Sequence, residues 1–216
     1  MASFHQFTLP CYQQGDNDCG YYCLRIAAEI TLKRKMTSDE AKVFRKFKGL
    51  CAQVGSQLEL STSRFSSFFP DIGVYFNRYE AYVEEPGEYI SPDTIKSILD
   101  QGKMVVVNIQ NMDFRRNTLV RCKGGGGHNI CCMGYDTRNF IFQDSNRYSN
   151  SCTKTMAILT LQKGYEAILA AGEDLEKRLK AMKTATHVTE MFVADTEEKI
   201  IVSRRRRSSR QRSSRR

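Results

Sequence analysis

The stretch QQGDNDCG at residues 13–20, which runs into YYCLRIAA at residues 21–28, decides how the rest of the chain is interpreted. A polar, turn-rich segment ends at Cys19, and apolar residues then recur at the three- and four-residue spacing of a helix with one buried face. We therefore predict a helix from Cys19 to about residue 32. A thiol at a helix N-terminus ionises readily, because free backbone N–H groups and the helix dipole favour negative charge there. Cys19 is a candidate nucleophile, although most cysteines are small buried hydrophobes.

The charge of the chain is concentrated at its end. The 216 residues suit one domain, and a hydrophobic fraction of 41% can build a core. Residues 203–216 hold eight arginines and no acidic residue, and without them 25 basic residues face 24 acidic ones. The net charge of +9 therefore falls to +1. We expect a folded domain over residues 1–202 and a disordered, basic Arg/Ser tail over residues 203–216.

The N-terminus and the cysteines bear on location. The opening residues MASFHQ lack the charged region and long apolar run of a signal peptide, and no apolar run reaches the ~18 residues of a membrane span. We expect a cytoplasmic protein without a membrane span; nuclear targeting and secretion into a host without a cleaved signal are alternatives. The cysteines are then expected to be thiols, and they are Cys11, Cys19, Cys23, Cys51, Cys122, Cys131, Cys132 and Cys152.

Periodicity and turn residues divide the chain into further elements. Thr37 with Glu40 resembles a capping box, and Ser91 is a cap followed by proline at the first helical position. Residues 111–127 are expected to form a long loop, and Asp136-Thr137 a tight hairpin turn. We predict helices over about 38–53, 61–69, 92–101 and 165–182, and strands over 74–76, 104–109, 128–135, 138–144, 156–161, 191–193 and 200–202. Helices followed by an antiparallel sheet indicate the α+β class.

His128 and Asp144 lie where they can serve Cys19. His128 opens an apolar strand after four glycines, whose lack of side chains permits close approach of backbone or substrate. Asp144 ends the next strand, and in a hairpin the start of one strand lies beside the end of the other. A histidine beside a thiol takes its proton, and an aspartate fixes the tautomer of that histidine and stabilises its protonated form. Each residue alone has an ordinary structural explanation, but together they predict a nucleophile, a base and an orienting carboxylate.

These motifs, in this order, resemble those of papain-like cysteine peptidases. Gln13-x5-Cys19 heads a helix, Gly127-His128 opens a strand and Asp144 closes the next one. Over roughly residues 7–150 the chain is most similar to the bacteriocin-processing, double-glycine peptidase family and its relatives. The resemblance implies a papain-like α+β fold, in which an N-terminal helical part with a central nucleophile helix packs on an antiparallel sheet.

The resemblance also implies a role for each residue. Cys19 would be the nucleophile, His128 the general base and acid, and Asp144 the residue that orients His128. Gln13 would donate its side-chain amide to the oxyanion, together with the backbone N–H of Cys19, and Gln14 is an alternative for this role. Ser145 stands where the family commonly has proline.

This apparatus predicts a thiol-dependent hydrolase that cleaves a peptide or isopeptide bond of a protein or peptide and needs no cofactor. Deamidation, transamidation and deubiquitination would use the same residues. A zinc site at Cys122, His128 and Cys131 is a weaker alternative, because the spacing fits no common zinc pattern and Cys131 and Cys132 point to opposite faces of a strand.

An alternative of a different class is a binding protein with an inactive Cys/His site. Its tail, Arg204–Arg216, would engage nucleic acid or an anionic surface through attraction to phosphate that is independent of sequence. The nearly neutral body disfavours this alternative, because nucleic-acid-binding domains usually carry a basic face of their own.

Overall fold

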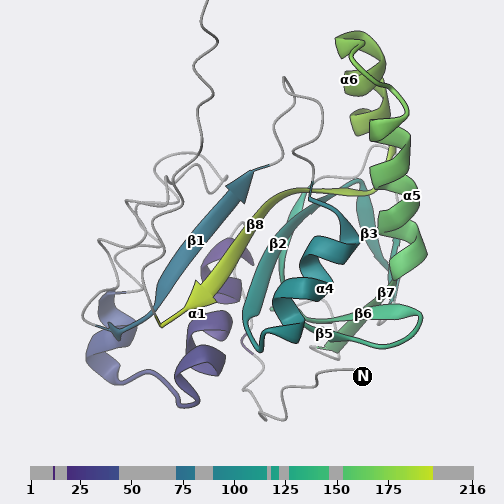
Figure 1. Ribbon diagram of the computed structural model, residues 1–216. Helices are drawn as coiled ribbons and strands as arrows, with labels where there is room; N and C mark the ends of the chain where they lie inside the picture. Colours follow the sequence, from purple (N-terminus) through teal and green to yellow (C-terminus); the bar gives the residue numbers. More distant parts are fainter. Residues whose placement is uncertain are drawn as a thin grey trace, which may run out of the picture.

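The computed structural model describes Tyr12 and residues 19–43, 72–80, 90–115, 118–121, 127–145 and 153–196. Figure 1 shows a sheet with helices on both of its faces. The labelled elements in chain order are α1 (Cys19–Leu32), β1 (Tyr75–Glu80), α4 (Pro92–Asp100), β2 (Met104–Gln110), β3 (Met112–Arg115), β4 (Thr118–Arg121), β5 (His128–Tyr135), β6 (Asn139–Gln143), β7 (Thr153–Ala157), α5 (Ile158–Leu169), α6 (Leu175–Thr184) and β8 (His187–Asp195).

The described strands form one eight-stranded sheet. Their order is β1-β8-β2-β5-β6-β7-β4-β3, and all the pairs are antiparallel except β4 with β7, which share a single parallel bridge. Strand β2 lies between β5 and β8, and helices cover it on both faces, which accounts for its uninterrupted apolar run MVVV. The predicted α+β class, with the Cys19 helix packed on an antiparallel sheet, is confirmed.

Successive residues of β2 point into two different hydrophobic cores. Met104 and Val106 pack in a core with the buried face of α1. Val105 and Val107 pack in the other core, which includes buried residues of α4 and α5. This alternation is that of a strand, whose side chains point to opposite faces in turn. Helix α1 therefore covers one face of the sheet, and α4 and α5 cover the other (Figure 1).

Local signals explain where the helices begin and end. The hydroxyl of Ser91 accepts a hydrogen bond from the backbone N–H of Thr94 at 3.0 Å, which caps α4 as predicted. Gly102 adopts a φ of +75° just after that helix, a conformation that favours glycine. The predicted capping box is also present, because the Thr37 N–H donates to the Glu40 carboxylate and the Glu40 N–H donates to the Thr37 hydroxyl.

Tyr12 contacts α1 through its hydroxyl and its ring. Its hydroxyl donates to the carboxylate of Glu29 at 2.8 Å, and the guanidinium of Arg25 lies 4.3 Å from the centre of its ring. Burial, together with the hydrogen bond to Glu29, raises the pKa of Tyr12 to about 12. The fully buried Glu29 also accepts from Arg25 and from the backbone N–H of Met36, so the interior carboxylate is well satisfied.

Two strands carry an extra residue that shifts the register. In the β5–β6 hairpin, Cys132 pairs with Phe142 but Gly134 pairs with Ile141, so that Met133 is a one-residue bulge. Along β8, the residue between Val188 and Glu190 is the extra one in its pairing with β2, and it is Thr189. The hairpin turn itself is one residue further along than predicted, because the flanking residues Asp136 and Asn139 are joined by a backbone hydrogen bond.

Three sequence-based predictions were wrong. The predicted loop 111–127 contains the strands β3 and β4, whose four-residue segments were too short to give a periodic signal. The predicted strand 156–161 ends at Ala157, and α5 begins at Ile158; a short apolar run fits either structure, and here Leu161 packs as part of a helix.

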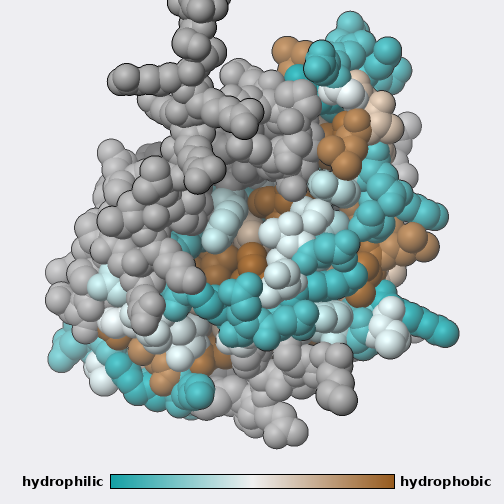
Figure 2. Space-filling model, viewed as in Figure 1, coloured by the Kyte–Doolittle hydropathy of each residue, from teal (hydrophilic) through white to brown (hydrophobic). Residues whose placement is uncertain are grey.

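The third error concerns the single helix predicted over residues 165–182. The chain turns through Gly172, with a φ of +60°, and Asp174 caps a second helix, α6. Because the helix is broken, Leu169, Leu175 and Leu179 do not continue the buried stripe of Ile168 and are at least 40% exposed. Apolar side chains are accordingly visible at the surface of the α5–α6 pair in Figure 2.

Several predictions lie outside the described residues. They are the helix 61–69, the strand 200–202, the basic tail 203–216 and the part of the helix 38–53 that follows residue 43. No helix in the described part of the chain is both long enough and apolar enough to cross a membrane.

We predict that Gly164→Ala destabilises the protein. A Cβ at this position of α5 would lie 1.8 Å from the carbonyl oxygen of Thr186, so the helix would have to move away from the start of β8. Overpacking of this kind costs about 1–3 kcal/mol, whereas glycine to alanine within a helix ordinarily gains about 1 kcal/mol. Urea unfolding measures the sign. Ala167→Gly, at an exposed position of the same helix, is the control, and an unchanged or raised stability of Gly164→Ala would contradict the contact.

Candidate active site

Three separate elements bring Cys19, His128 and Asp144 to one place. Cys19 is the first residue of α1, His128 is the first residue of β5, and Asp144 directly follows β6. The β5–β6 hairpin places the start of one strand beside the end of the other. Because α1 packs on β5 and β2, its N-terminus lies at the same end of the sheet.

His128 lies between the thiol and the carboxylate. Its Nε2 is 3.0 Å from Oδ1 of Asp144, which is only 1% exposed. His128 also lies beside Cys19, close enough to lower the pKa of the thiol. Since Nε2 faces Asp144, Nδ1 is the ring nitrogen left for the sulfur. In this arrangement one side of the ring can exchange a proton with the thiol while the other side is held by a carboxylate.

The electrostatics of the site favour the charged form of both partners. Burial lowers the pKa of His128, but hydrogen bonds to Asp144 and Cys19, and the charges on these groups, raise it to about 9. Burial raises the pKa of Cys19, yet hydrogen bonds from His128 and Asn129 and the charge of the imidazolium leave it below its ordinary value. Both shifts act in the direction of a thiolate–imidazolium pair.

The other described cysteines differ sharply from Cys19. Cys23, Cys131 and Cys132 are fully buried, and burial raises the pKa of each thiol. Cys23 and Cys131 lie in the core beneath α1, whereas Cys132 lies in the core on the opposite face. These three cysteines therefore serve the packing of the two cores.

The described part of the chain contains no cluster of metal ligands that would support the zinc-site alternative. No group of three or more His, Cys, Asp or Glu side chains there is arranged to hold a metal ion. Cys131 points into the core beneath α1, and Cys122 lies outside the described residues.

The predicted oxyanion donors lie outside the described residues as well. Gln13 and its alternative Gln14 both belong to residues 13–18, so the side-chain part of the oxyanion hole stays a prediction. The backbone N–H of Cys19 belongs to the first turn of α1, where helix N–H groups have no partner within the helix. It is available in principle to a developing negative charge beside the sulfur.

The glycine before His128 has a specific neighbour. A Cβ at Gly127 would lie 2.2 Å from Nε2 of Gln110 and 3.0 Å from Oδ1 of Asn108. The sequence predicted that backbone or substrate approaches closely at the glycine run. The structure shows that side chains of β2 occupy this space beside Gly127.

Sequence reasoning missed two residues that lie close to the three predicted ones. Asn129 donates its side-chain amide to Sγ of Cys19 at 3.8 Å. Lys154 of β7 is buried; burial lowers its pKa, while the charge of Asp144 acts in the opposite direction. Asn129 could have been found from the sequence, because it is a single amide in the otherwise apolar strand segment NICC. A buried polar group of this kind requires a hydrogen-bond partner.

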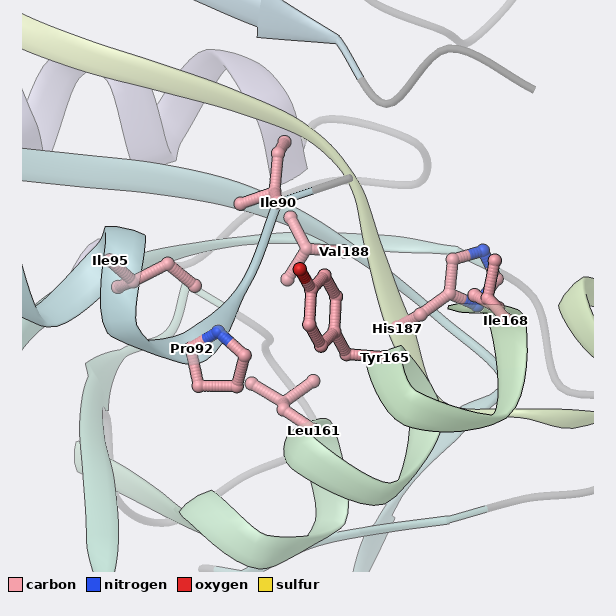
Figure 3. A pocket seen from close by; sticks show the side chains of 8 residues that line it. All are labelled: Ile90, Pro92, Ile95, Leu161, Tyr165, Ile168, His187 and Val188. Carbon is pink, nitrogen blue, oxygen red and sulfur yellow. The ribbon is translucent and has the colours of Figure 1, made fainter. Parts of the chain in front are cut away.

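A pocket between α4, α5 and β8 lies apart from these residues. None of Cys19, His128 and Asp144 lines it, and its walls come from α4 and the residue Ile90 before it, from α5 and from the start of β8 (Figure 3). Its walls are mostly apolar, and they are formed by Ile90, Pro92, Ile95, Leu161, Tyr165, Ile168, His187 and Val188.

We predict that the two described histidines titrate on opposite sides of the ordinary value. The pKa of His128 should be near 9, and Asp144→Asn should lower it by removing the charge that stabilises the imidazolium. His187, whose pKa burial lowers, is the internal control and should not respond. Because the pKa of His128 is raised on folding, its contribution to stability is complete below about pH 6.5 and is lost as the pH rises through about 9. Titration of the imidazole resonances by NMR tests both points, and a wild-type His128 that titrates at or below 6.5 would refute them.

Comparison with known proteins gives a distant structural likeness. No protein-family model matches the chain, and neither does any curated protein. The fold is similar to the crystal structure of a "putative C39-like peptidase" from Bacillus anthracis, with 11% sequence identity and a TM-score of 0.47 over 92% of this chain and 100% of that chain. A likeness this distant carries no functional argument, and the chemistry of the site is judged from its own residues.

Proposed function

We propose that the protein is a papain-like cysteine hydrolase that cleaves amide bonds of a protein or peptide substrate, with Cys19 as the nucleophile. The observation that supports this most directly is the position of His128, which lies beside Cys19 and whose Nε2 is 3.0 Å from Oδ1 of Asp144. Cys19, His128 and Asp144 lie together at the end of one sheet, which supports the proposed roles of nucleophile, base and orienting group.

In the acylation step, the Cys19 thiolate attacks the carbonyl carbon of the scissile bond. A carbon–sulfur bond forms, and the carbonyl electron pair moves to the oxygen. The Cys19 N–H and the side-chain amide of Gln13 are the proposed donors to this oxyanion. As the tetrahedral intermediate collapses, the carbon–nitrogen bond breaks and the His128 imidazolium gives its proton to the leaving amine.

In the deacylation step, neutral His128 takes a proton from a water molecule, whose oxygen attacks the thioester carbon. The carbon–sulfur bond then breaks, the product leaves as a carboxylic acid, and the thiolate–imidazolium pair is restored. Asp144 keeps Nε2 protonated throughout, so that Nδ1 exchanges protons with the thiol, the amine and the water. The same cycle with another acceptor or leaving group gives deamidation, transamidation or deubiquitination.

On this proposal the basic tail takes no part in the chemistry. Arg204–Arg216 would bring the enzyme to anionic surfaces or nucleic acid by charge alone. An inactive binding protein differs from this proposal in two measurable ways. Its Cys19 would be an ordinary thiol, and truncation after Val202 would abolish its interaction while leaving no other activity to lose.

We predict that iodoacetamide at neutral pH modifies Cys19 faster than the other described cysteines. Cys19 combines a lowered pKa with partial exposure, whereas Cys23, Cys131 and Cys132 are fully buried with raised pKa values. Peptide mass spectrometry after brief labelling identifies the site. His128→Ala should slow the labelling of Cys19, and truncation after Val202 should leave it unchanged.

The corresponding activity test uses a peptide vinyl sulfone and a mixed peptide library. Cys19→Ala should lose both covalent capture and hydrolysis, and Cys23→Ala is the matched control one helical turn away. Hydrolysis that survives in Cys19→Ala, or a wild-type Cys19 that is labelled no faster than the buried cysteines, would overturn the proposed function.

A further inference from the structure

A chain of hydrogen-bonded amides crosses three strands and ends at the Cys19 sulfur. Thr189 of β8 donates its hydroxyl to Oδ1 of Asn108 in β2 at 3.1 Å. Asn108 donates its Nδ2 to Oδ1 of Asn129 in β5 at 3.3 Å, and Asn129 donates its Nδ2 to Sγ of Cys19 at 3.8 Å. Asn108 and Asn129 are directly opposite each other in the β2–β5 pairing.

The donors in this chain all point toward the sulfur. Oδ1 of Asn108 accepts from the Thr189 hydroxyl and also from Nε2 of Gln110 at 2.8 Å. With its oxygen so occupied, Asn108 turns its NH₂ group toward Asn129. The oxygen of Asn129 then faces Asn108, and its NH₂ group faces Cys19. A side-chain amide has one donor end and one acceptor end, so each orientation fixes the next.

A bulge in β8 positions Thr189, the first residue of this series of hydrogen bonds. Thr189 is the extra residue in the β2–β8 pairing, where Asn108 pairs with Glu190 and Ile109 with Val188. A bulge of this kind redirects a side chain that a regular strand would place elsewhere.

Asn129 is held too firmly, and lies too deep, to serve as a substrate-binding group. It is only 4% exposed. Its backbone carbonyl accepts the S–H of Cys23 at 3.1 Å, which ties the same residue to the second turn of α1. Its side-chain amide therefore contacts Cys19 from the buried side, so that it acts on the sulfur and not on a substrate.

We propose that Asn129 is a further catalytic residue, whose side-chain amide stabilises the Cys19 thiolate, and that Asn108 and Thr189 are positioning residues that keep this amide turned toward the sulfur. This inference rests on the proposed function, in which the thiolate is the reacting species. It adds to that function a donor on the buried side of the sulfur that is separate from His128.

Other charged and titratable groups near the sulfur act alongside Asn129. His128 and Asp144 form the ion-pair side of the site, and the buried Lys154 lies within the field of Asp144. Cys23 lies one turn along α1, and Glu190 of β8 pairs with Asn108. All of these groups remain in an Asn129 variant, so a change in the titration of Cys19 there reports the loss of the amide.

The test measures the pH profile of Cys19 alkylation by iodoacetamide in Asn129→Leu, a substitution of nearly the same shape without a donor. We expect the pKa of Cys19 to rise by about one unit, because a hydrogen bond to a charged group is lost. Below the titration range, alkylation should then slow about tenfold. The matched control is Asn77→Leu, at an asparagine of β1 that is 3% exposed, which should leave the profile unchanged.

A milder pair of variants tests the chain at its far end. Thr189→Val removes the hydroxyl that holds Asn108, and should raise the pKa of Cys19 in the same direction by a smaller amount. Thr189→Ser keeps the hydroxyl and should restore the wild-type profile. These variants decide the matter if Asn129→Leu does not fold, and an unchanged profile in Thr189→Val would then overturn the inference.

The outcomes separate this inference from the proposed function. If wild-type Cys19 titrates at a low pH and Asn129→Leu folds without changing that pKa, the role of Asn129 is refuted and the hydrolase proposal stands. If wild-type Cys19 titrates as an ordinary thiol, both are refuted.

Discussion

The packing of α1 across β5 and β2 is the interaction on which the rest of the structure depends. The body of the helix buries side chains that include Leu24 and Ile26 in one core with Val106, Cys131 and Phe192 of the sheet. Complete burial of such side chains contributes about 1.5–3 kcal/mol each. The same packing fixes the position of the first turn of the helix. The position of the Cys19 sulfur is thus set by hydrophobic packing along the whole helix.

The face of the sheet that α1 covers is apolar at one end and polar at the other. Beneath the body of the helix it presents apolar residues, and beneath the first turn it presents Asn108 and Asn129, which lie opposite each other on neighbouring strands. Buried amides are costly unless they are paired, and here each amide pairs with the next. The polar end of this face is therefore stable only as a connected set, which also gives the sulfur a fixed environment.

The sequence was sufficient to predict the elements whose signals are local. The apolar periodicity after Cys19 gave α1 its observed bounds, and the proline after Ser91 gave the start of α4. The order of Cys19, His128 and Asp144 along the chain predicted a site whose members the structure brings together. The register of β2 against β5, and the break of the predicted helix 165–182 in two, depend on contacts between distant residues. Asn129 escaped notice for this reason, since its partners lie 21 and 110 residues away in the sequence.

The bulge at Met133 sets the phase of the hairpin. With the extra residue, Gln143 pairs with Cys131, and continuing this register by one residue places Asp144 opposite Ile130, on the face that His128 shares. If Met133 were paired as a regular strand residue, the register fixed at the turn would carry on to the strand end, and Gln143 and Ser145 would occupy that face in place of the carboxylate. The identity of the group that faces the imidazole therefore depends on the unpaired residue at Met133. Loss of the bulge, with every residue retained, would exchange a charged neighbour for a neutral one without altering any of the side chains concerned.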